Sequence, residues 1–194
     1  MSANVWNEQV DIGLLNELRK SVKITNESGE LVALNDNAFV VRKPEEDFKV
    51  EQYPCVSIYN RMHSFDSRRY FQDPIIKSVI KDENTASLEE SAIPFNLSYQ
   101  IDFWSEYQTE MNDMTMTWLL EHYRQFNLPV VDDSGVARTC NVLSSGNGTK
   151  SDLVVNKERL FHTIFLYDIW VELDNEIKYN KGIVGVVNID TVRK

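Results

Sequence analysis

One short segment alternates strictly between apolar and polar residues, and it places the strongest limit on what this chain can fold into. Five consecutive odd positions are apolar and the four positions between them are polar. Successive side chains of a β-strand point to opposite faces of the sheet, so the pattern predicts a strand with one buried face and one face in water. The apolar positions are Phe95, Leu97, Tyr99, Ile101 and Phe103.

A helical pattern follows this strand directly. Tyr107, Met111, Met114 and Trp118 recur at i, i+4, i+7 and i+11, which predicts an amphipathic helix over about 106–126, ending before Pro129. A Met-rich helix face can act as an adaptable binding surface, but we favour packing in the core. Apolar residues at positions 10, 14, 15, 18 and 22 predict a second amphipathic helix over about 7–22.

The remaining apolar runs are short, β-branched or aromatic, and separated by turn residues. Because strands follow strands without regular helices between them, antiparallel pairing is favoured over parallel βαβ units. We therefore predict an α+β fold, with one antiparallel or mixed sheet, two main helices packed on one face, and long loop excursions. The whole chain, 1–194, is expected to form a single domain. The expected strands are 31–34, 39–41, 53–61, 128–131, 136–143, 152–155, 159–173 and 182–189.

Two segments are expected to be loops. The first is a long excursion over about 61–93, although 75–81 within it can form a short helix or strand, and the second is a flexible Gly-rich loop over 144–150. Asp132–Gly135 is a hairpin signal and Tyr179–Gly182 a turn signal. The roles of 61–93 and of 144–158 are not evident from the sequence.

The strand predicted over 159–173 is apolar on both faces. Such a strand must be covered on both sides, either by helices of its own chain or by another subunit. The sequence leaves both alternatives open.

Charge limits the possible partners. Thirty acidic and 20 basic side chains give a formal net charge of −10, which disfavours a protein that grips nucleic acid through its phosphates. A conduit to which DNA must not adhere is compatible with this charge. Because no run approaches 18 apolar residues and the N-terminus lacks a signal-peptide pattern, we expect no membrane segment and synthesis in the cytoplasm.

Catalytic signatures are scarce. His63, His122 and His162 are isolated in sequence, and Asp168 is too far along the predicted strand to pair with His162. The Gly-rich run ending in Gly148-Thr-Lys150 lacks the order of a phosphate-binding loop. Turn chemistry accounts for the aspartates at 132 and 133.

We therefore predict a non-enzymatic protein with no catalytic residue, cofactor or metal site, although an enzyme that uses residues distant in sequence stays open. Cys55 and Cys140 are predicted to be buried free thiols.

A resemblance to a known family rests on 92–126 and 159–174. Ala92–Glu106, with the sequence AIPFNLSYQIDFWSE, runs into the Met-rich helix, and Phe161–Leu173, FHTIFLYDIWVEL, forms a second long strand. This arrangement resembles the tail terminator proteins, also called tail completion or neck proteins, of tailed bacteriophages.

The resemblance implies a structural virion protein of the tail or neck, assembled in the host cytoplasm as a ring that is typically a hexamer. It implies contacts with other copies of itself, the tail tube protein, the head connector or adaptor, and the sheath if the tail is contractile. DNA would only pass through the lumen. The alternatives are another head–tail adaptor or tube-associated protein, and a small soluble enzyme or ligand-binding domain.

Two groups of residues are candidate interaction sites. Arg61, Arg68 and Arg69 lie in the most basic and aromatic stretch and could dock an acidic partner. The expected terminal strand offers an apolar edge that a neighbouring copy could extend by β-augmentation. Its apolar residues are Ile183, Val184, Val186 and Val187.

Overall fold

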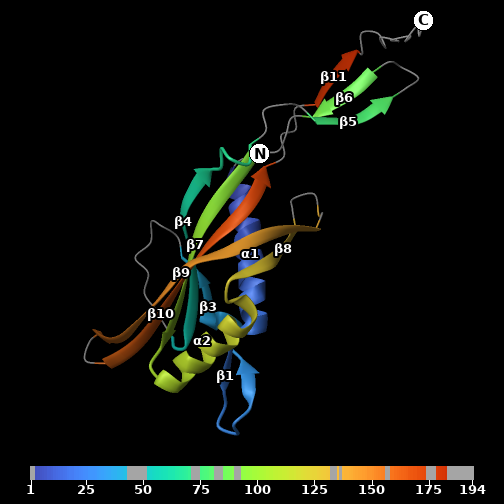
Figure 1. Cartoon of the computed structure of the whole chain (residues 1–194). Helices are drawn as coiled ribbons and strands as arrows, with labels where there is room; N and C mark the ends of the chain where they lie inside the picture. Colours follow the sequence, from blue (N-terminus) through green and yellow to red (C-terminus); the bar gives the residue numbers. More distant parts are fainter. Residues whose placement is uncertain are drawn as a thin grey trace, which may run out of the picture. The chain divides into compact units, whose positions relative to one another are not determined.

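The computed structural model describes residues 3–42, 52–70, 75–80, 85–89, 93–131, 135, 137–155, 158–173 and 178–182. These residues form two helices, a six-stranded mixed sheet and smaller antiparallel sheets, so the predicted α+β class is confirmed (Figure 1). Contacts divide the chain into two compact units, one of 1–64 and 96–171 and the other of 65–95 and 172–194. The single-domain organisation stays a prediction.

The six-stranded sheet has the order β3-β4-β7-β10-β9-β8. The strand β3 runs parallel to β4, whereas β8, β9 and β10 pair antiparallel. The two long strands expected from the sequence are confirmed as β7 and β10. The strand bounds are β3 Phe39–Val41, β4 Cys55–Phe65, β7 Ile93–Ser105, β8 Gln125–Val131, β9 Ala137–Val155 and β10 Glu158–Leu173.

The sequence predicted a loop over 144–150, and this prediction is wrong because these residues belong to the strand β9. Ser144 pairs with Tyr167, Gly146 with Leu166 and Gly148 with Ile164, so the Gly-rich run continues the strand. Glycine favours turns locally, but the ladder offered by the long strand β10 overrides that preference. The hairpin expected at Asp132–Gly135 is confirmed by the pairing of β8 with β9 on either side of it.

Two helices cover one face of this sheet. Helix α1 is Ala3–Ser21 and helix α2 is Gln108–His122, and the two contact each other. Helix α1 lies close against β8, because a Cβ atom added at Gly13 would come within 3.0 Å of the Pro129 carbonyl oxygen. Tyr99 of β7 donates a hydrogen bond of 2.7 Å to Asp11 of α1, and burial raises the pKa of Asp11. The expected placement of both helices on one face is therefore observed.

Helix α2 is shorter than the sequence predicted. Hydrogen bonds from the sheet strand β10 fix its last turn. Its end at His122 leaves Phe126 to pair with Val142 in the β8–β9 ladder. Tyr167 of β10 donates to the His122 carbonyl at 3.2 Å and accepts a bond of 2.8 Å from the Trp118 indole. Burial raises the pKa of Tyr167 to about 12, so this hydroxyl stays a donor at neutral pH.

A two-stranded hairpin joins α1 to the rest of the first unit. The strands β1, Lys23–Thr25, and β2, Leu31–Ala33, flank a turn in which Gly29 has a φ of 82°. Helix α2 supports β1, since the Lys23 amide donates to Thr117 at 3.1 Å and the Thr25 amide donates to Asp113 at 2.9 Å. A short 3-10 turn, Asp36–Ala38, then leads into β3.

The second unit contains a small antiparallel sheet of order β11-β6-β5 (Figure 1). Its strands are Ile75–Ile80 (β5), Thr85–Glu89 (β6) and Lys178–Gly182 (β11). The long loop expected over 61–93 is therefore largely strand in its described residues, and the turn expected over 179–182 is also strand. The pairing of β6 with β11 joins segments about ninety positions apart, so local sequence patterns could not reveal it.

Neither helix in the described part of the chain is long and apolar enough to cross a membrane.

Candidate functional site

The outer side of α2 carries an exposed apolar stripe. Met116, Leu120 and Tyr123 follow one another at i, i+4 and i+7, and their exposed fractions are 58%, 78% and 59%. At about 100° per residue, these positions fall on one side of the helix axis. We call these three residues the outer stripe.

The inner side of the same helix is also apolar, and it lies in the core. Met111, Met114 and Trp118 are buried, on the side of α2 opposite the outer stripe. Core packing, the interpretation favoured from the sequence, therefore holds for Met111 and Met114 but not for Met116. A helix that fills its own core with one side and exposes large apolar residues on the other is typical of an interaction surface.

The six-stranded sheet ends in β8 at one side and in the three-residue strand β3 at the other. An edge strand has backbone groups that a further strand can pair with. Among the described edge residues, Val131 of β8 is 58% exposed and Val41 of β3 is 37% exposed. These edges are the places in the first unit where another chain could add to the sheet.

A charged cluster lies on the face of β7 opposite the helices. Asp102 is fully buried, and it accepts bonds of 2.6 Å from the Arg42 guanidinium and 2.8 Å from His162 Nε2. The Trp104 ring stacks on His162 with 3.6 Å between the ring centroids. The sequence predicted that the even positions of this strand face water. That prediction is wrong at Asp102, because Arg42 and His162 donate hydrogen bonds to its carboxylate inside the protein.

The sequence contained only a weak signal for this cluster. The strand β10 is apolar on both faces, which already indicated that the second sheet face is covered. However, Arg42 precedes Asp102 by 60 positions and His162 follows it by 60, so no local sequence pattern connects the three residues. His162 is isolated in sequence as noted above, but it is paired in the structure, and with Asp102 rather than with Asp168.

The chemistry of the neighbouring thiol fits a structural cluster. Cys55 is buried, and burial raises its pKa to about 11, against a smaller opposing effect of Arg42. A catalytic thiol needs a lowered pKa, so the environment of Cys55 is the opposite of an activating one. Cys140 is also buried, and neither cysteine forms a disulfide, as the sequence predicted.

The three candidate arginines have different surroundings. Arg61 in β4 and Arg68 are exposed. Arg69 is half-buried, pairs with Asp66 at 2.8 Å and donates to the Phe95 carbonyl at 3.0 Å. Arg61 belongs to the first unit, and Arg68 and Arg69 belong to the second. The interaction residues expected at 183, 184, 186 and 187 lie outside the described residues.

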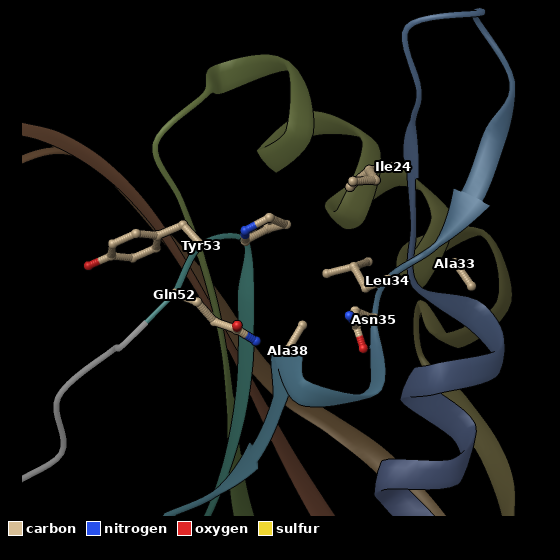
Figure 2. A pocket seen from close by; sticks show the side chains of 8 residues that line it. Ile24, Ala33, Leu34, Asn35, Ala38, Gln52 and Tyr53 are labelled. Atoms are coloured by element: carbon tan, nitrogen blue, oxygen red, sulfur yellow. The ribbon is translucent and has the colours of Figure 1, made fainter.

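A small hollow opens beside β1 and the start of β4. Its volume is about 240 Å³, and Figure 2 shows Ile24, Leu34 and Ala38 directed toward it while the ring of Tyr53 points away. Sites for metabolites and cofactors usually measure about 300–1,000 Å³ and contain converging polar groups. The hollow therefore does not favour a metabolite-binding function.

Comparison with solved structures gives a structural likeness, whereas comparison by sequence gives none. No protein-family model matches the chain, and no curated protein matches it. Among solved structures, the chain is similar to the sheath/tube terminator of an extracellular contractile injection system (PVC), determined by cryo-EM in the extended state. The TM-score is 0.47 with 14% sequence identity, and the match covers 100% of this chain and 64% of the other. The chain thus spans about 64% of the length of that terminator.

Proposed function

We propose that this protein is a structural subunit that assembles with copies of itself into a ring terminating a phage-like tail. In this role it caps the tail tube, and the sheath if the tail is contractile, and it joins the tail to the head connector in the neck. The proposal rests on the family resemblance of 92–126 and 159–174 and on the surface described above.

The outer stripe of α2 is the observation that carries the proposal. Met116, Leu120 and Tyr123 expose large apolar surface on a helix that is fixed rigidly from its other side by Trp118. Burial of apolar side chains against a neighbouring copy is favourable by about 25 cal/mol for each Å² removed from water. A head-to-tail contact that repeats around an axis closes into a ring when the rotation between neighbouring copies permits it.

The net charge of −10 supports a role as a conduit. An acidic lumen repels the phosphates of passing DNA, so the DNA would move through without adhering. The proposed partners are therefore other copies of this chain, the tube protein, the connector or adaptor and, in a contractile tail, the sheath protein. The residues at 183, 184, 186 and 187 are proposed to extend this self-contact through a strand edge.

The direct test is assembly of the full chain. Size-exclusion chromatography with light scattering should give a closed oligomer, with six copies as the expected number, either alone or once tube protein is added. Electron microscopy should then show rings at the ends of tubes that have stopped growing. A chain that stays monomeric with tube protein and leaves tube length unchanged would overturn the proposal.

Arg61 in the first unit, and Arg68 and Arg69 in the second, are each proposed to dock an acidic partner surface. Arg61 and Arg68 are exposed, so Arg61→Glu and Arg68→Glu should leave the fold intact while weakening binding to the connector or tube protein. Arg69 is unsuitable for this test because its ion pair with Asp66 supports the local structure. Matched Arg→Gln variants separate loss of charge from its reversal, and unchanged binding in the reversed variants would exclude this docking role.

A further inference from the structure

The strand β10 is covered unevenly on its two faces. Its odd positions over 161–171 are buried, on the face where Tyr167 contacts helix α2. On the other face His162 is buried, but the cover ends there, because the even positions 164, 166 and 168 are half-buried and Trp170 is 37% exposed. The sequence left open whether helices of the same chain or another subunit cover the second face. In the described part of the chain, the helices cover only the first.

The strand β9 continues this second face beside β10. Gly146 pairs with Leu166 and Gly148 pairs with Ile164, and paired residues of antiparallel strands lie on the same face. We call the second face of this strand pair the outer sheet face. Its residues are Leu143, Gly146, Gly148, Ile164, Leu166 and Trp170.

The two glycines of the outer sheet face are not required by the chain itself. Neither has the positive φ that favours glycine. A Cβ atom added at Gly148 would meet no atom within 4 Å, and one added at Gly146 would meet Leu166 at an ordinary 3.7 Å. Glycine weakens the interior of a strand, and it often marks a place that another backbone approaches closely. These two positions therefore indicate a partner outside the chain.

We propose that the outer stripe of a neighbouring copy packs on the outer sheet face. This inference rests on the proposed self-assembly and identifies the second surface of the contact. The outer stripe lies on the side of α2 away from the sheet, and the outer sheet face is the face that the helices do not cover. The two surfaces are therefore different and do not overlap, so the contact is head-to-tail, as a ring requires.

Shape and charge favour this pairing. Without side chains at Gly146 and Gly148, the backbone of a neighbouring helix can come close to β9, and Leu120, which is 78% exposed, gains apolar partners on β10. The exposed Arg124 follows the outer stripe directly and lies over the Tyr123 ring at 5.5 Å. Asp168, on the same face as Trp170, offers Arg124 an opposite charge.

The first test is Gly148→Val in the full chain. Valine favours strands and meets free space within the chain, so the urea midpoint of the monomer should be unchanged or raised. In the assembly the new side chain occupies space that the neighbour needs, so association should weaken at least about tenfold by sedimentation velocity. Asn147→Val is the matched control, because this exposed residue pairs with Phe165 on the other face. It should leave association unchanged.

A mixture of two variants tests which surfaces meet. Leu120→Lys damages the outer stripe and Gly148→Val damages the outer sheet face, so each chain alone should stay monomeric. Mixed in equal amounts, they retain one intact pair of surfaces and should form dimers but no ring. If Gly148→Val forms rings as readily as the parent chain, this inference is overturned while ring assembly stands. A parent chain that never assembles, even with tube protein, overturns the assembly function and this inference together.

Discussion

The two sides of α2 are similar in composition and opposite in surroundings. The inner side places two methionines and a tryptophan in a closed core, whereas the outer stripe places a methionine, a leucine and a tyrosine at the surface. Hydrophobic periodicity alone does not distinguish the two, because both sides are apolar at helical spacing. The contrast shows that an apolar helix side can stabilise the fold or remain available for a partner, and only the surrounding sheet decides which.

The largest effect is expected on the inner side. Trp118→Ala removes a fully buried ring and its hydrogen bond to Tyr167, and it should lower the free energy of unfolding by about 3–5 kcal/mol. Tyr123→Ala is the matched aromatic truncation on the outer stripe. It should lower the free energy of unfolding of the monomer far less. Urea unfolding of both variants measures the difference, and equal losses would remove the distinction between the two sides.

A smaller effect is expected where α1 meets β8. Gly13→Val places side-chain atoms against the Pro129 carbonyl and the Val130 side chain, and this overpacking should cost about 1–3 kcal/mol. Ile12→Val introduces the same residue at the adjacent exposed position and serves as the control. Thermal unfolding of the two variants compares them, and a Gly13→Val chain as stable as the control would mean that the helix layer is looser than described.

The smallest effect on stability is expected at the centre of the outer stripe. Leu120 is 78% exposed, so Leu120→Lys should change the free energy of unfolding by no more than about 0.5 kcal/mol. The same variant should lose self-association, because a lysine in an apolar contact leaves its charge desolvated. Sedimentation velocity measures the association, and rings formed as well by Leu120→Lys as by the parent chain would show that the outer stripe is not the contact.

Local patterns predicted the parts of the fold that local forces determine. The alternation around Tyr99 and the helical spacing around Met114 both gave the right element. The end of α2 was missed because Phe126 gains more from the ladder with Val142 than from another helical turn. The Gly-rich part of β9 was missed because its partner strand lies downstream.

The candidate sites were harder to predict because they depend on residues far apart in the chain. The alternating pattern predicted that Asp102 faces water. In the structure it is buried, and it accepts hydrogen bonds from Arg42 and His162. The docking role of the arginines at 61, 68 and 69 stays a prediction, and the side chains at 61 and 68 are exposed, as that role requires.

Oxidation of methionines by hydrogen peroxide, followed by mass spectrometry, tests the role of the outer stripe most directly. Met116 and Met62 are each 58% exposed, whereas Met111 and Met114 are buried, so in the free chain the first two should oxidise at least about tenfold faster. In the assembled ring, the account predicts that Met116 becomes as slow as Met111. A Met116 that oxidises as fast in the ring as in the free chain would contradict it.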